Sequence, residues 1–214
     1  MARRLPIYLL IDTSGSMTGE PIAAVKNGID MLVQDLRNNP QALETAWLSI
    51  ITFGGEAKQV VPLTEIDSFK CPELVAGGKA ELGAALRLVC ECRKRECRKP
   101  WKDDNGLWRK GDYRPWIYMF SDGNPQETNL EESIRSFKSE RWGSVLCCTL
   151  ADSADFTTLK MIAGEESTIN LMSVSPSCFA SFFRWISEDP VFPFEKQSAA
   201  STAMVPLSPQ IAIV

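Results

Sequence analysis

Histidine is absent from this chain of 214 residues. Its absence excludes catalysis by Ser-His-Asp and Cys-His arrangements, because both need an imidazole as the general base. It also excludes zinc sites that are built on histidine. Any functional site therefore depends on other side chains.

The sequence also has no long apolar run and no strong charge of either sign. The longest apolar stretches are only as long as strands, and MARRLP at residues 1–6 leads directly into one of them without the apolar segment of a signal peptide. Lys and Arg number 23 against 27 for Asp and Glu, a net charge of −4, so neither nucleic acid nor a membrane is indicated as a partner. We expect a cytoplasmic protein.

The cysteines favour reduced thiols over a disulfide framework. They number seven, which is odd, and several lie in apolar strand or helix patterns. Cys90 and Cys97 share one face of a predicted helix while Cys92 points elsewhere, so we expect Cys90 to be buried and Cys92 exposed, without zinc. Cys147 and Cys148 point to opposite faces of a predicted strand, and we expect both to pack under helices.

Apolar runs alternate with segments of helical period, the order of a doubly wound α/β protein. The chain length suits one such domain. We therefore predict a three-layer α/β/α fold with a mostly parallel, Rossmann-like sheet and one antiparallel edge strand. The predicted strands are 6–12, 46–54, 57–63 (the antiparallel one), 116–121, 144–150 and 168–174. The predicted helices are 20–38, 81–97, 128–140, 155–163 and 176–188.

Two segments lie outside this alternation. Residues 98–115 are rich in Lys and Arg, carry Trp101 and Trp108, and are predicted to form a long loop or hairpin. Such a loop either grips phosphate or an acidic protein surface, or is solvated with its tryptophans packed back on the body. The domain is expected over 1–188. Residues 189–214, with several prolines and a Ser/Ala-rich middle, are expected to be a poorly packed or strand-adding extension.

A polar cluster follows the first predicted strand. IYLLIDTSGSM at residues 7–17 ends in Asp12, Ser14 and Ser16, where a buried parallel strand leaves its sheet and ligands bind. A carboxylate and hydroxyls are hard oxygen donors that suit Mg²⁺ or Mn²⁺. In a purely structural interpretation, this cluster is a strand-end turn whose side chains cap backbone groups. The stretch WIYMFSDG at residues 116–123 argues against a purely structural turn, because a second buried strand ends there in Asp122, at the same end of the sheet.

These motifs resemble the metal-ion-dependent adhesion site (MIDAS) of von Willebrand factor A (vWA) domains. D-x-S-x-S after the first strand and S-D-G after a later strand carry the resemblance, which runs from about residue 5 to 188. RLPIYLLIDTSGSMTGEPI, LETAWLSIITF and SFFRWIS are similar, more narrowly, to the bacterial TerY-like proteins associated with tellurite resistance. The resemblance implies a non-catalytic, magnesium-dependent protein-interaction module, in which an acidic side chain of a partner completes the metal coordination.

The resemblance assigns metal ligands with one departure. Ser14 and Ser16 are expected to touch the ion directly, and Asp12 and Asp122 to hold it largely through water. Where the family places a threonine ligand, GGKAELG at residues 77–83 has Ala80. Water could fill that position, Glu81 could reach in, or the ammonium group of Lys79 could replace the ion.

Two rival functions follow from the same residues. The first is a metal-independent scaffold with Lys79 in the cleft. The second is a phosphoryl hydrolase with Asp12 as nucleophile. The hydrolase is disfavoured, because the position two residues later, where a general acid would stand, is occupied by Ser14.

Overall fold

The computed structural model describes residues 2–121, 127, 130–149, 156–164 and 168–170. Its strands are β1 Leu5–Ile11, β2 Ala46–Gly54, β3 Glu56–Glu65, β4 Trp101–Lys102, β5 Trp108–Arg109, β6 Trp116–Ser121, β7 Ser144–Thr149 and β8 Thr168–Asn170. Its helices are η1 Gly15–Met17, a single 3₁₀ turn, followed by α1 Glu20–Asn38, α2 Pro40–Thr45, α3 Leu82–Glu96, α4 Leu130–Ser139 and α5 Phe156–Ala163.

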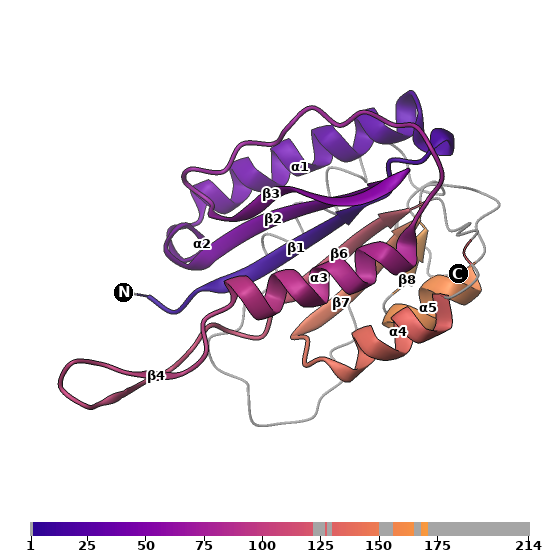
Figure 1. The fold of residues 1–214 in the computed structure, drawn as a ribbon. Coiled ribbons are helices and arrows are strands. Elements are labelled where there is room, and N and C mark those ends of the chain that lie inside the picture. Colours follow the sequence, from indigo (N-terminus) through magenta and orange to yellow (C-terminus); the bar gives the residue numbers. More distant parts are fainter. Residues whose placement is uncertain (1, 122–126, 128–129, 150–155, 165–167, 171–214) are drawn as a thin grey trace.

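Six strands form one sheet in the order β3-β2-β1-β6-β7-β8, with helices on both faces (Figure 1). β3 is antiparallel to β2, and the other neighbouring strands are parallel. The chain builds outward from β1 in one direction through β2 and β3, and then in the other through β6, β7 and β8. The order therefore reverses between β1 and β6, and the carboxyl ends of these two strands form the edge where such sheets bind ligands.

β1 lies at the centre of the fold and is buried along its whole length. Its side chains alternate between two apolar clusters, as successive residues of a strand must. Ile7, Leu9 and Ile11 pack toward α1 and α2, whereas Tyr8 and Leu10 pack toward α3, α4 and α5. The near-continuous apolar run in the sequence is therefore explained by burial on both faces.

The predicted fold class is confirmed, and most predicted elements agree with the structure. The strand predicted over 46–54 and the helix predicted over 20–38 have the predicted bounds, and β3 is the antiparallel edge strand. The segment 98–115 contains a short antiparallel hairpin of β4 and β5. The helix expected over 176–188, the end of the strand expected over 168–174 and the extension 189–214 lie outside the described residues.

Two expectations about the helices were wrong. No helix was predicted over α2, which begins at Pro40 and is capped by Asn39; the Asn39 side chain accepts hydrogen bonds from the backbone N–H groups of Gln41 and Ala42. Cys92 was expected to be exposed but is fully buried. α3 packs against β3 as well as α4, so it buries more than the single face that periodicity indicates.

The other described cysteines agree with the expectation of reduced thiols. Cys90, Cys147 and Cys148 are buried, as expected. All six described cysteines are free thiols. Burial raises the pKa of the Cys147 thiol to about 12.

None of the helices in the described part of the chain combines the length and the apolarity needed to cross a bilayer.

A buried ion pair fastens the N-terminal segment to the chain that follows the hairpin. The Arg4 guanidinium donates from Nε to Asp112 Oδ1 at 2.9 Å and from Nη2 to Asp112 Oδ2 at 2.5 Å. The two side chains are 10% and 4% exposed. Asp112 also accepts a hydrogen bond from the backbone N–H of Arg98. Removal of the carboxylate would therefore leave a buried cation and an unsatisfied amide.

We expect Asp112→Ala to lower the free energy of unfolding by about 3 kcal/mol, because loss of one partner strands a buried charge. Asp30→Ala is the control. It removes the exposed (i, i+4) pair between Lys26 and Asp30 in α1 and should change stability by less than about 0.5 kcal/mol. Urea unfolding followed by circular dichroism measures both variants. Equal losses would contradict the assignment of Arg4 and Asp112 as a buried anchor.

Candidate metal centre

Asp12 follows β1 directly and lies inside the protein. Its backbone N–H donates to the carbonyl of Phe120 in β6 at 2.8 Å, which continues the parallel pairing by one residue. Its side chain has no exposed surface. Oδ1 accepts a hydrogen bond from the Ser14 N–H at 2.8 Å, and Oδ2 accepts one from the Ser121 hydroxyl at 2.7 Å. The Asp12 carboxylate is thus held in one orientation between the ends of two strands.

The two predicted serine ligands lie next to each other. Ser14 Oγ and Ser16 Oγ are 3.0 Å apart. Ser14 is buried and Ser16 is exposed, so the pair leads from the interior to the surface. The 3₁₀ turn of η1 presents both hydroxyls on one side, and the Met17 side chain anchors that turn in the core with 1% exposure.

Residues 77–79 and the end of β2 support this loop from beside it. Gly77 N–H donates to the Thr13 carbonyl at 2.7 Å, and Gly15 N–H donates to the Gly78 carbonyl at 3.0 Å. The segments approach so closely that glycine is required. A Cβ on Gly54 would lie 2.1 Å from the Thr13 carbonyl oxygen, and one on Gly78, whose φ is +82°, would lie 2.8 Å from Gly55 Cα.

The structure describes Ala80, which stands where the resemblance implies a threonine ligand, and its neighbours Lys79 and Glu81. Ala80 forms a bridge with Gly54, and its methyl group packs against the apolar cluster under α3, so this position supplies no oxygen donor. Glu81 is half-buried at the start of α3. Lys79 is exposed and has no ion pair with Asp12 or any other described acid. The scaffold hypothesis that places Lys79 in the cleft gains no support from these contacts.

Asp122, the second predicted carboxylate, lies outside the described residues, so its place in the site stays a prediction. The preceding residue, Ser121, is described, and its hydroxyl donates a hydrogen bond to the Asp12 carboxylate. Within the described residues, no three His, Cys, Asp or Glu side chains gather as a metal cluster. The predicted ligand set relies on Ser14 and Ser16, and serine is not one of those four residue types.

Sequence reasoning missed two side chains near this edge of the sheet. Ser121 orients Asp12, and the S-D-G motif that contains it was the available signal. Glu127 Oε2 accepts a hydrogen bond from the Gly83 N–H in the first turn of α3 at 2.7 Å. Burial raises the pKa of the Glu127 carboxyl, the hydrogen bond from Gly83 and the charge of Arg87 oppose the rise, and Glu81 adds to it. No sequence pattern indicated Glu127.

Comparison with known proteins agrees with this architecture. The family model of the von Willebrand factor type A domain matches residues 7–181. No curated protein is similar enough to match the chain.

Several solved structures share the fold. A von Willebrand factor type A protein from Catenulispora acidiphila has a TM-score of 0.63 and 16% identity, with 87% of this chain and 42% of that one covered. The ArnB paralog VWA2 from Sulfolobus acidocaldarius has a TM-score of 0.60 and 17% identity, covering 86% and 45%. Proximal thread matrix protein 1 from the mussel byssus, with a zinc-occupied MIDAS motif, has a TM-score of 0.56 and 14% identity, covering 87% and 46%. The chain thus spans less than half the length of each.

Gly54→Ala tests the close packing around the DTSGS loop. We expect a loss of about 2 kcal/mol in the free energy of unfolding, because the added methyl group meets backbone atoms of Thr13 that can move only with the loop. Gly77→Ala is the matched control, since its Cβ would meet nothing within 4 Å and its φ lies outside the left-handed region. That variant should be as stable as the wild type or slightly more so. Denaturant unfolding decides between them, and an unaffected Gly54→Ala protein would refute the packing described.

Proposed function

Because this chain belongs to the von Willebrand factor type A family, we propose that it is a non-catalytic protein-interaction module that binds an acidic group of a partner protein through a divalent metal ion. The observation that carries the proposal is the Asp12 carboxylate, oriented by Ser121 and Ser14 beside a pair of serine hydroxyls. The zinc-occupied MIDAS motif of proximal thread matrix protein 1 is consistent with it.

The described donors fit a hard divalent ion. In an octahedral shell with Mg–O distances near 2.1 Å, adjacent ligand oxygens are about 3 Å apart, and Ser14 Oγ and Ser16 Oγ are separated by 3.0 Å. All the donors are oxygens, which favours Mg²⁺ or Mn²⁺ over softer metals. We therefore propose Mg²⁺ or Mn²⁺ as the resident ion.

Each side chain has a distinct task. Ser14 and Ser16 would hold the ion directly. Asp12, fully buried with both carboxylate oxygens engaged in hydrogen bonds, would contribute its negative charge from behind them, through water. Asp122 is proposed as the second indirect ligand. Glu81 is proposed as an alternative to water where Ala80 provides no oxygen.

The partner's carboxylate is the remaining ligand in this proposal. A bound ion supplies a positive charge with an open position for an anionic oxygen. Ser14 and Ser16 are neutral ligands, so they leave that charge largely uncompensated on the exposed side. The proposal also includes a cytoplasmic location and the tellurite-resistance context of TerY-like proteins.

The rival functions make different demands. A scaffold that uses Lys79 in place of the ion requires that divalent metals do not bind, so that titration with Mg²⁺ or Mn²⁺ releases no heat. A phosphoryl hydrolase requires turnover of a generic phosphate ester that Asp12→Asn removes. Both oxygens of Asp12 are engaged within the fold and the side chain is fully buried, which disfavours its use as a nucleophile.

Isothermal titration with Mg²⁺ and Mn²⁺ tests the metal half of the proposal. We expect saturable binding in the wild type and an affinity at least about tenfold lower in Ser16→Ala, since this change deletes one direct ligand from an exposed position. Ser68→Ala removes an exposed hydroxyl far along the chain and should bind as the wild type does. Absence of heat in the wild type would overturn the metal site.

Affinity capture tests the partner half. Partner proteins should be retained by the full chain in magnesium, lost in chelator, and lost from Asp12→Asn, which removes the buried negative charge that supports the ion. Ser68→Ala should retain them. Capture that is as strong in chelator as in magnesium would show that protein binding does not use this site.

A further inference from the structure

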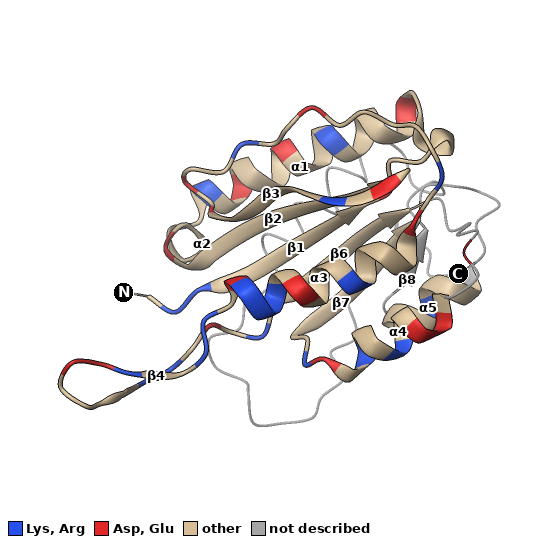
Figure 2. Cartoon of the chain, viewed as in Figure 1, with Lys and Arg blue, Asp and Glu red and all other residues tan. Residues whose placement is uncertain are grey.

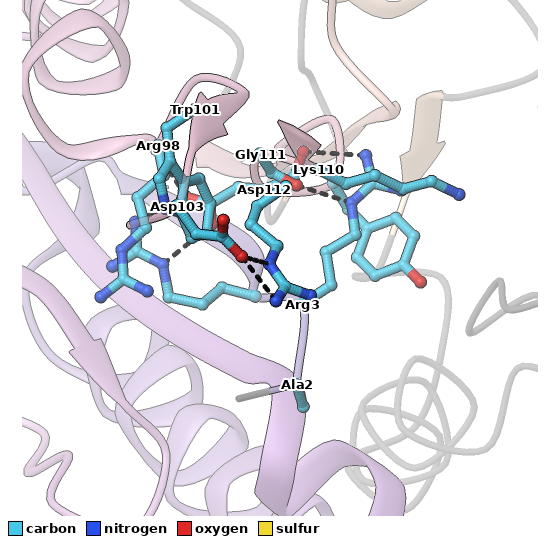
Figure 3. A pocket seen from close by; sticks show the side chains of 11 residues that line it. Ala2, Arg3, Arg98, Trp101, Asp103, Lys110, Gly111 and Asp112 are labelled. Carbon is cyan, nitrogen blue, oxygen red and sulfur yellow. Dashed lines mark hydrogen bonds and ion pairs between the residues drawn. The ribbon is translucent and has the colours of Figure 1, made fainter. Parts of the chain in front are cut away.

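A pocket lies at the amino-terminal end of β1, at the opposite end of the strand from Asp12. This pocket, of about 550 Å³, opens between the N-terminal residues that lead into β1 and the hairpin of β4 and β5 (Figure 3). This volume falls within the range of ligand-binding clefts. β1 spans seven residues between this edge and Asp12, or roughly 23 Å at 3.3 Å per residue, so the pocket is separate from the metal centre.

The pocket lining is predominantly basic. Its acidic members are Asp103 and Asp112, and its basic members are Arg3, Arg4, Arg98, Arg109 and Lys110. In Figure 2 positive charge gathers along the chain at the base of the hairpin. A chain with a net charge of −4 thus concentrates cations at one place.

Three of the five cations are committed to interactions within the protein. Arg4 is paired with Asp112, and Arg109 with Asp103 at 2.6 Å. The Arg3 guanidinium donates to the backbone carbonyls of Gly111 and Asp112 and lies 3.9 Å from the centroid of the Tyr113 ring. These contacts hold the pocket wall in a fixed shape.

The remaining two cations have no such partner among the described residues. Arg98 uses its backbone N–H to bind Asp112, but its guanidinium has no hydrogen bond or ion pair with any described residue, and neither has the Lys110 ammonium. Both side chains are exposed. Because the two pocket carboxylates are already neutralised by Arg4 and Arg109, Arg98 and Lys110 give the pocket an unbalanced positive charge.

Large apolar side chains are exposed in the pocket and on the hairpin beside it. Trp101, which lines the pocket, is 45% exposed, and on the same hairpin Leu107 is 60% and Trp108 is 70% exposed. Of the two alternatives for residues 98–115, the one in which both tryptophans pack back on the body is thus not supported. Exposed tryptophan beside arginine is the composition of protein-binding surfaces, in which aromatic and Arg residues supply most of the binding energy.

We propose that this pocket docks an acidic segment of a partner protein. Its carboxylates pair with Arg98 and Lys110, and an apolar side chain of the same segment packs on Trp101. The two oxygens of a carboxylate match the planar fork of a guanidinium. The observations favour a protein over a nucleic acid, since only Arg98 and Lys110 are left to pair with an anion, too few to follow a run of phosphates, and exposed Trp101 offers an apolar contact.

A fluorescein-labelled peptide with glutamates on both sides of one tryptophan is the probe, and its anisotropy is measured with the full chain in EDTA. The chelator removes the metal centre from the experiment, so failure here and failure of the proposed metal site are distinguishable. We expect saturable binding by the wild type and by Asp12→Asn. We expect Arg98→Glu/Lys110→Glu to weaken it by at least about tenfold. A peptide with glutamine in place of glutamate should not bind.

Lys58→Glu/Lys70→Glu is the matched control, because it changes the net charge equally at two exposed lysines outside the pocket. It should bind the acidic peptide almost as the wild type does, whereas Trp101→Ala should bind several-fold more weakly. Four results would overturn the proposal: no saturable binding, equal loss in both charge-reversal variants, binding that requires magnesium, or tighter binding of a single-stranded oligonucleotide that Arg98→Glu/Lys110→Glu abolishes.

Discussion

The pairing of β1 with β6 at their carboxyl ends is the constraint on which the rest of the structure depends. It brings residues more than a hundred positions apart into contact, through the hydrogen bond from Asp12 N–H to the Phe120 carbonyl and the one from the Ser121 hydroxyl to the Asp12 carboxylate. Both strands are buried along their whole length, so a shift of register by one residue would move every side chain to the opposite face and disrupt the packing of both apolar clusters. The core thus fixes the geometry of the polar edge.

The proposed metal centre depends equally on close backbone packing. The DTSGS loop lies against residues 77–79 and the end of β2, through contacts that leave no room for a Cβ at Gly54. This support orients Ser14 and Ser16 before any partner arrives. The methyl group of Ala80 contributes packing at a place where the family supplies a ligand, so the exposed side of the site relies more heavily on the two serines. A site with few protein ligands is well suited to accept an oxygen from outside.

The parts of the fold that sequence could predict are those governed by periodicity over many residues. The bounds of α1 and β2 follow from long, regular apolar patterns, and the place of Asp12 follows from the end of such a pattern. α2 was missed because its six residues are too few to show a period, although Asn39 and Pro40 carried a capping signal. Cys92 was misplaced because α3 packs on two sides. Long-range contacts such as Glu127 with Gly83 leave no pattern in the sequence.

Two chemically different surfaces lie near opposite ends of β1, which is buried between them. Each is proposed to bind carboxylates, one through an ion and the other through arginine and lysine. A crystal structure with Mn²⁺ tests the ion-mediated site. We expect an anomalous density peak in contact with Ser14 Oγ and Ser16 Oγ, with the Asp12 and Asp122 carboxylates converging behind it. An anomalous map without a peak at the DTSGS loop, or an Asp122 side chain directed away from Asp12, would refute the metal site.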